Sequence, residues 1–378
     1  MRSKVLWTGF CVGIALLVGW CAQGAEAAER SVSGMAKEIG EFRQLFAQKE
    51  QALKEKNWHM YRATLDEENQ TYLHEQKRWF QDAVRVIEPG SFRLQLLQVK
   101  AVGRGTAVVQ VKQSYRMGKK AVSFNYPLSL KKRTDGWKDA DLAFSVLKHE
   151  RISVYYSDPA LEREATLAMN TLQQAYEGLH RRMGWTTKGI EVKLYHRPEV
   201  FRQFVKPSLP EWAGGWHEAN QAIKFIGGWG ELRLLAAGLV HELTHQMVSE
   251  LSNDNAAYWL QEGAAMYYEA HLLPRLMVGH EMNRLKRRMS LAELERAKLE
   301  KLPSDQAEQY YLSAYLAYKS LAERWGDRAF GAVLRELGKY PYLDLDSSEK
   351  QPTLNQRTRN AWMRVFGRSI EGMVGMSA

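Results

Sequence analysis

Residues 231–270 constrain the fold of this chain more strongly than any other stretch, because they predict two helices with little chain between them. Residues 231–251 and 256–270 both keep apolar side chains at helical spacing. The residues "SNDN" (252–255) form the loop between them. A connection this short favours antiparallel packing. We therefore expect polar residues of the second helix to fold back over those of the first.

The first of these two helices carries two histidines and a glutamate in the pattern "HELTH". His241 and His245 are four residues apart, so they lie within about 40° of each other on one helix face, opposite an apolar face. Two neutral imidazoles one turn apart can bind one zinc ion, and Glu242 projects close enough to take a proton from a zinc-bound water. Ala237 and Gly238 are small, and we expect them to leave room near the ring nitrogens.

The second helix decides between a metal site and an ordinary pair of amphipathic helices. A His-Glu-x-x-His pattern also arises by chance, and a catalytic zinc ion usually has three protein ligands and an open fourth position. Glu262 follows His245 by 17 residues and lies on the second helix. If the helices pack antiparallel, Glu262 can return over the histidines and complete the ligand set.

"HELTH" followed by "WLQEG" resembles the gluzincin clan of zinc metallopeptidases, whose third ligand is a glutamate on the next helix. Residues 150–370 more closely resemble the bacterial peptidase-MA-like group, in the order of their elements and in a Trp-Leu-x-Glu-Gly pattern. The resemblance implies a zinc cofactor held by His241, His245 and Glu262, with Glu242 as general base.

The same resemblance implies two further features of the site. A tyrosine on a later helix stabilises the oxyanion, and Tyr311 matches that position best, with Tyr310 as the neighbouring alternative. The strand near residues 222–226 is expected to be a sheet edge that pairs with an extended peptide substrate.

Other polar residues near these motifs have less defined roles. His217 is expected to be a loop residue near the cleft and not a ligand. Met266 stands where some gluzincins carry a supporting carboxylate. The carboxylate or amide that would hold a ligand histidine therefore stays open. Glu269, two turns after Glu262, could do so, although a surface or core role is more frequent; Asn253 and Asp254 are further candidates.

The rest of the sequence indicates an α+β protein of two domains after a leader. Residues 35–87 have helical periodicity, and residues 92–147 read as about four antiparallel strands separated by glycine-containing turns. This pattern resembles a cystatin-like or nuclear transport factor 2-like domain. A mainly helical gluzincin domain with a small mixed sheet is expected to follow. The predicted limits are 1–27 for a signal peptide, 28–148 for the accessory domain and 149–378 for the peptidase-like domain.

The first 27 residues have the layout of a secretory signal peptide, with basic residues, an apolar run and then small residues. An uncleaved anchor is the alternative, and lipidation of Cys21 is disfavoured by the large Trp20 before it. Cys11 and Cys21 are the two cysteines of the chain, so the mature protein would have none. We expect export to the cell envelope, the periplasm or the medium of a bacterium.

The chain is basic, with 53 Lys and Arg against 43 Asp and Glu, a formal charge of +10. A basic exported protein can associate with an anionic cell-wall polymer or membrane surface. Nucleic acid is not expected as a partner, because no binding motif accompanies the charge. The densest basic stretch, 283–301, reads as a solvated helix with a capping box from Ser290 to Glu293. The oligomeric state cannot be read from the sequence.

Three functions fit these features. The first is an exported zinc metallopeptidase acting on peptides or proteins. An endopeptidase is favoured over an aminopeptidase, because no element to capture a free amino terminus precedes the zinc helix. The second is a non-catalytic envelope binding or scaffold protein that keeps a peptidase fold. The third is a hydrolase of cell-wall peptides.

Overall fold

The computed structural model describes residues 13–228, 230–272, 282–345 and 347–371. Contacts divide the chain into two compact units, one made of residues up to 66 with 88–141, the other of 67–87 with 142 onward. The sequence placed residues 67–87 and 142–148 in the accessory domain, but their contacts place them in the second unit. The predicted limits assumed that each domain is one continuous stretch of chain. Residues 1–12 of the predicted signal peptide lie outside the described residues, and the side chains of residues 13–33 are not described either.

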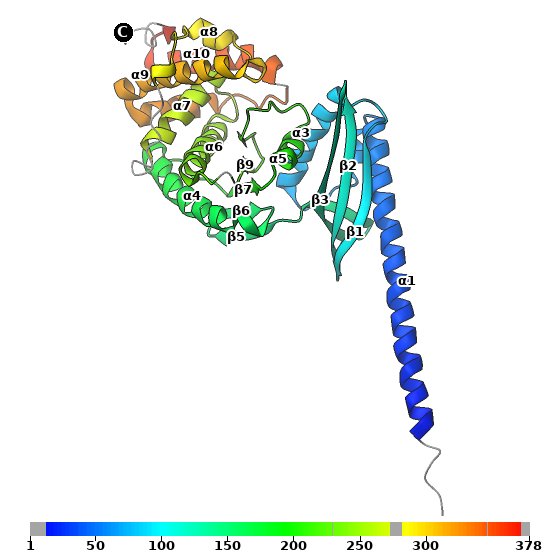
Figure 1. Ribbon diagram of the computed structural model, residues 1–378. Helices are drawn as coiled ribbons and strands as arrows, with labels where there is room; N and C mark the ends of the chain where they lie inside the picture. Colours follow the sequence, from blue (N-terminus) through cyan, green and yellow to red (C-terminus); the bar gives the residue numbers. More distant parts are fainter. Residues whose placement is uncertain (1–12, 229, 273–281, 346, 372–378) are drawn as a thin grey trace, which may run out of the picture. The chain divides into compact units, whose positions relative to one another are not determined.

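The first unit combines an antiparallel sheet with helices α1 (Gly13–Lys54) and α2 (Trp58–Arg62). The four strands follow one another in chain order, which confirms the antiparallel strands expected from residue 92 onward, except that residues 145–147 belong to the second sheet (β1–β3 are labelled in Figure 1). Their bounds are β1 (Arg93–Gly103), β2 (Thr106–Met117), β3 (Lys120–Arg133) and β4 (Gly136–Leu142).

One face of this sheet is buried and the other is open to solvent. Val109, Val111 and Leu128 on the inner face are buried, and the residues between them point outward because strand side chains alternate. Phe42 of α1 meets Trp137 of β4 edge to face, with 5.1 Å between ring centroids. Helix α1 therefore covers the apolar face, as expected for a helix-plus-sheet unit.

The second unit contains a five-stranded mixed sheet in the order β5-β6-β7-β9-β8. Strands β6, β7 and β9 are parallel neighbours, and β5 and β8 are antiparallel at the two ends. The bounds are β5 (Ser145–His149), β6 (Ile152–Tyr156), β7 (Ile190–Tyr195), β8 (Gly215–Trp216) and β9 (Ile223–Ile226). With the first sheet, this makes the chain a mixed α/β protein with one antiparallel and one mixed sheet.

The expected edge strand near residues 222–226 is not an edge, and this prediction was wrong. Strand β9 is covered by β8, with Gly215 opposite Phe225 and Trp216 opposite Lys224. The two-residue strand β8 was too short to be detected by alternation of apolar residues. The free edge of the sheet next to the candidate site is therefore β8.

Helices cover this sheet and extend beyond it (Figure 1). Helix α4 begins after the 3₁₀ turn η1 (Pro159–Leu161), where Asp158 accepts a hydrogen bond from the Ala160 amide, and it ends at Gly184 in left-handed backbone. The capping box of Ser290 and Glu293 is also present. The helices are α3 (Gln70–Val86), α4 (Glu162–Met183), α5 (Pro198–Val205), α6 (Leu232–Ser252), α7 (Tyr258–His271), α8 (Leu291–Arg296), α9 (Ser304–Leu337) and α10 (Ser347–Phe366), with short 3₁₀ turns η3 (Met282–Arg284) and η4 (Leu299–Lys301).

Within the described part of the chain, none of the helices combines the length and the apolar character that crossing a membrane requires.

Candidate metal centre

Helix α6 is seated on the sheet by a close contact at Gly238. A Cβ atom there would lie 2.4 Å from the Phe225 ring of β9, so any larger residue would push the helix away. Phe225 therefore fills the space at Gly238. The expectation from the sequence, that Gly238 leaves room near the imidazole nitrogens, was wrong. Leu239, Val240 and Leu243 are fully buried. Leu239 and Leu243 lie on the face of α6 opposite His241 and His245, so their burial turns the two histidines toward the cavity.

A second close contact positions α7 and α9. The Gly263 backbone lies so near α9 that a Cβ atom would be 2.4 Å from the Ala314 carbonyl oxygen and 2.8 Å from Tyr318 Cβ. Glycine is the residue that permits this approach. The contact explains why a glycine follows Glu262, and it brings the preceding turn of α9 toward the histidines of α6.

The structure brings His241, His245 and Glu262 together. One ligand atom from each residue lies within 4.8 Å of the others. The Glu262 Oε2 atom is 3.3 Å from Nε2 of His241 and 3.3 Å from Nε2 of His245. The three side chains are largely buried, with 13–14% of each exposed. Two imidazole nitrogens and a carboxylate oxygen converging on one point are a donor set that suits a transition-metal ion.

Glu269 holds His241 from the other side, and sequence reasoning did not assign it. The Nδ1 atom of His241 is 3.1 Å from Glu269 Oε2, while its Nε2 atom faces Glu262. A metal-binding histidine usually donates its second ring N–H in this way. The signal was present, because residues seven apart lie on one helix face. Asn253 and Asp254 are excluded from this role, since they bind the Tyr340 carbonyl and Lys350, respectively.

The electrostatics of the cluster favour a positive charge at its centre. Burial tends to lower the pKa of His241, but Glu262 and Glu269 raise it well above its ordinary value. Burial tends to raise the pKa of Glu262, yet His245 and His241 lower it to about 2. In the metal-free protein, a proton on an imidazole thus balances the buried carboxylates. A metal cation meets the same electrostatic demand, so the residues fit a bound metal.

Glu242 lies beside this cluster, against the sheet edge. A Cβ atom at Gly215 of β8 would be only 2.7 Å from Glu242 Oε1, so the carboxylate lies over the space left by that glycine. The side chain is nearly buried. Burial raises the pKa of Glu242, and His245 and His241 oppose the shift. A carboxyl group with a raised pKa is better suited to accept and return a proton near neutral pH.

The two tyrosines considered for α9 occupy different environments. The Tyr311 ring centroid is 6.2 Å from that of His241, and its side chain lines the cavity. Burial, with Glu262 and Glu242, raises the pKa of Tyr311 well above its ordinary value, so its hydroxyl stays protonated. Tyr310 is fully buried, and its hydroxyl finds no hydrogen-bond partner among the described residues. The geometry favours Tyr311 over Tyr310 as the residue facing the cluster.

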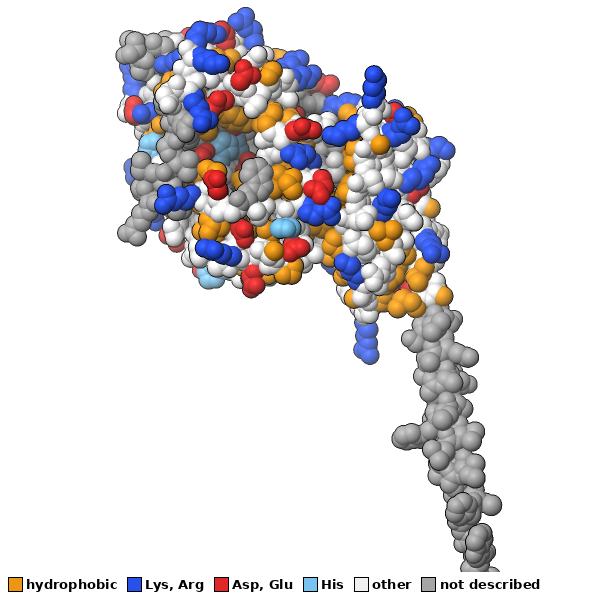
Figure 2. Space-filling view, in the orientation of Figure 1, with side chains coloured by type: hydrophobic (Ala, Val, Ile, Leu, Met, Phe, Trp, Pro, Cys, Tyr) orange, Lys and Arg blue, Asp and Glu red, His pale blue; other side chains and the backbone are white. Residues whose placement is uncertain are grey.

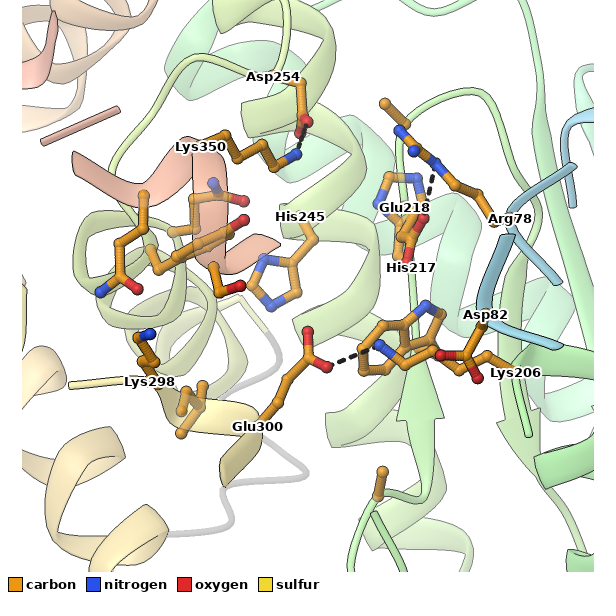
Figure 3. Close-up of a pocket in the computed structure, with 18 of the residues that line it drawn as sticks. Arg78, Asp82, Lys206, His217, Glu218, His245, Asp254, Lys298, Glu300 and Lys350 are labelled. Carbon is orange, nitrogen blue, oxygen red and sulfur yellow. Dashed lines mark hydrogen bonds and ion pairs between the residues drawn. The ribbon is translucent and has the colours of Figure 1, made fainter. Parts of the chain in front are cut away.

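A cavity of about 840 Å³ opens over the cluster and includes His241, Glu242, His245 and Glu262 in its wall. Figure 3 shows Lys206 and Glu300 meeting in this cavity, 2.7 Å apart, although they come from the chain after α5 and from η4. Lys206 also lies over the Trp216 ring, 4.2 Å from its centroid.

The cavity wall contains one residue that the sequence placed near the cleft and one helix that it did not. His217 lies in a loop of the wall and outside the group of three, as expected. Burial, His245 and Lys224 lower its pKa to about 3, so it is neutral. Helix α3 adds Arg78 and Asp82, although the sequence assigned residues 28–148 to an accessory domain (Figure 3). Pairing Arg78 with Glu218 and Asp82 with Ser208 brings these distant segments together.

The described residues thus contain one candidate metal-binding group, formed by α6 and α7 and supported by Glu269. Geometry and donor chemistry show that it could hold a metal ion, without specifying which. Comparison of the sequence with protein-family models and with curated proteins finds no match to either.

Proposed function

We propose that this protein is an exported zinc-dependent metallopeptidase of the gluzincin type, acting as an endopeptidase on peptides or proteins. The observation that carries the proposal is the convergence of His241, His245 and Glu262 within 4.8 Å, with the nearly buried carboxylate of Glu242 beside them. A purely structural metal site needs no such neighbouring base. Zinc is the metal that this set of two histidines and a glutamate most often binds in hydrolases.

When bound, zinc would supply Lewis-acid polarisation of the scissile carbonyl and lower the pKa of a water molecule. Glu242 accepts the proton of the attacking water and returns it to the leaving amine, a role that its raised pKa suits. Tyr311 keeps its hydroxyl proton and donates a hydrogen bond to the developing oxyanion. Glu269 fixes the ring orientation of His241.

The substrate would lie extended along β8. This strand forms the outer edge of the mixed sheet, and the Glu242 carboxylate lies next to its residue Gly215. An extended peptide can add to a free strand edge through backbone hydrogen bonds. Side chains larger than hydrogen at position 215 would collide with Glu242, so Gly215 lets the peptide approach the base.

We also propose that the first unit is a cystatin-like or nuclear transport factor 2-like accessory domain and that the second is a gluzincin domain. The supporting observations are the helix packed on an antiparallel sheet and the mixed sheet that precedes α6 and α7. A signal peptide over residues 1–27 would deliver the protein to the cell envelope or beyond.

Replacing Glu242 tests the proposal directly. We expect the wild-type protein to bind about one zinc ion per chain and to cleave casein or a peptide library. Glu242→Gln should keep the zinc and lose about 10²- to 10⁴-fold in kcat, because it removes the base but no ligand. Glu250→Gln is the matched control, since Glu250 lies on the same helix outside the cavity wall.

Two outcomes would replace this function with another. Wild-type protein that holds a full complement of zinc but cleaves no peptide would favour the envelope scaffold. Cleavage of purified peptidoglycan with no cleavage of casein would favour a hydrolase of cell-wall peptides, with the same residues acting on a different substrate.

A further inference from the structure

The positive charge of this chain is concentrated in one structural element. Residues 91–134 contain ten Lys and Arg and no Asp or Glu, against 53 and 43 in the whole chain, so the remainder has 43 of each. This segment comprises β1, β2, β3 and the turns that join them. The net charge of +10 is thus the charge of one three-stranded part of the first sheet.

Acidic residues outside the segment form ion pairs with some of these Lys and Arg side chains. Other Lys and Arg side chains along β2 and its two turns form none in the part of the chain that the structure describes. Arg93 and Arg116 pair with Glu50 and Glu88 at 3.9 Å and 3.3 Å, and the basic residues at 131–133 pair with Asp66 or Glu41. Arg104, Lys112 and Lys119 are exposed and form no ion pair among the described residues. They lie in the β1–β2 turn, in β2 and in the β2–β3 turn.

The exposed side of this sheet is polar across three strands around Lys112, although Leu97 of β1 is also exposed. The row across the three strands at Lys112 is completed by Gln95 and Asn125, and the next row holds Arg93, Ser114 and Ser123. The aromatic residues Tyr115, Phe124 and Tyr126 point to the buried side. We call this surface the basic strand face: the outward side chains of β1–β3 with the two turns, centred on Lys112. Figure 2 shows many Lys and Arg and few acidic side chains over this unit.

We propose that the basic strand face binds a linear hydrophilic polymer that carries phosphate groups. Lys and Arg attract such a polymer, and Ser, Asn and Gln side chains are suitable hydrogen-bond donors to phosphate oxygens. A strand advances roughly 3.3 Å per residue, so the cations from Arg104 to Lys119 would follow an extended chain for about 50 Å.

Two other classes of partner fit less well. Single-stranded nucleic acid is usually bound by aromatic side chains that stack on bases, and the aromatic residues of β2 and β3 face inward. Insertion into a lipid surface uses exposed apolar side chains, whereas the rows at Lys112 and Ser114 are polar. The surface is complementary to repeated anions on a water-soluble backbone. This inference does not depend on the proposed peptidase activity.

The test is a titration of the full-length protein with inorganic polyphosphate at increasing NaCl concentration. The triple variant Arg104→Gln, Lys112→Gln, Lys119→Gln removes three cations that have no ion pair to lose, so the fold should be unaffected. We expect at least tenfold weaker binding at 0.1 M salt and a logarithmic salt slope smaller by about two, since each neutralised phosphate contributes about 0.7.

A second triple variant provides the control, because it removes the same charge elsewhere. Arg163, Lys188 and Arg328 are exposed in the second unit and form no ion pair among the described residues. Their replacement by Gln should leave polyphosphate binding nearly unchanged. Equal weakening by both triples would overturn the proposal in favour of net charge alone. Wild-type binding to phosphatidylglycerol vesicles without binding to polyphosphate would overturn it in favour of a membrane surface.

Discussion

The two units of this protein use charged residues in opposite ways. In the first, β1–β3 carry cations outward with no acidic residue in the segment. In the second, acidic and basic groups are drawn inward, as in the cluster of His241, Glu262 and Glu269. Outward charge acts at long range and is screened by salt, whereas buried charge is screened little and requires a partner at fixed distance. The first arrangement suits the attraction of a charged polymer, and the second suits a reaction at one fixed site.

Buried carboxylates stabilise both units by the same means. Asp66 in the first unit pairs with Arg133 at 2.6 Å and Lys131 at 3.1 Å. Glu75 in the second pairs with Lys193 at 2.5 Å and Lys224 at 3.4 Å, and it accepts a hydrogen bond from the Ala222 amide. The Glu75 cluster ties α3 to β7 and β9. The units therefore differ in the use of their surfaces, and less in how their cores hold charge.

Metal removal should produce the largest effect and separate the two units most clearly. Chelation is expected to abolish peptide cleavage, and added zinc should restore it, because three ligands of the site lie in the second unit. Polyphosphate binding should be unchanged by the chelator. The Arg104, Lys112, Lys119 triple variant should show the converse, with full cleavage and weak polymer binding. Parallel loss of both properties in either experiment would contradict the division of roles.

Glu75→Gln is expected to destabilise the second unit by about 3–5 kcal/mol, because it removes the buried carboxylate that pairs with both Lys193 and Lys224. Thermal unfolding followed by circular dichroism measures this loss. Glu177→Gln is the control, since it removes only a surface pair with Arg181 and should cost under about 0.5 kcal/mol.

The same glutamate predicts the response of the fold to acid. Burial tends to raise the pKa of Glu75, but Lys193 and Lys224 lower it below its ordinary value. A carboxyl group with a lowered folded-state pKa stabilises the protein above its unfolded pKa of about 4.3, and this contribution is lost as pH falls toward the folded-state pKa. Wild-type melting temperature should therefore drop more steeply below about pH 4.3 than that of Glu75→Gln.

Tyr311→Phe should reduce kcat by about 10²- to 10³-fold with little change in KM, the usual effect of removing one oxyanion donor. Tyr310→Phe is a matched control one residue away, because the Tyr310 hydroxyl is buried and has no hydrogen-bond partner among the described residues. Peptide kinetics on both variants distinguish the two tyrosines. A larger loss in Tyr310→Phe would reverse their assignment.

Glu269→Gln is expected to have the smallest effect, a 10- to 100-fold loss of metal affinity measured by competition with a chelating dye. The amide can still accept a hydrogen bond from His241 but has no charge. Glu323→Gln on α9, an exposed residue paired with Lys319, should leave affinity unchanged. Equal affinity in all three proteins would show that Glu269 plays no part in holding the ligand.

The candidate site was predictable to the extent that it depends on helical periodicity. The spacing of His241 and His245 sets their common face, and the short loop before α7 favours the antiparallel packing that brings Glu262 toward them. Glu269 was underestimated because nothing in its sequence context distinguishes a partner for His241 from a surface residue. Strand β8 was missed since two residues carry no periodicity, and the edge was consequently assigned to β9.

The sequence by itself predicted helices α6 and α7, the antiparallel strands of the first sheet and the residues of the candidate metal centre, because these follow from local patterns, whereas α10 was not predicted and only residues 291–296 of the expected helix over 283–301 form α8. Its charge pattern also placed all net charge in residues 91–134. Tertiary structure decided which residues meet: α3 joins the cavity wall, Phe225 fills the space at Gly238, and Gly263 admits α9 so that Tyr311 faces His241. The physical reason is that such contacts depend on the shape and close packing of residues far apart in the chain.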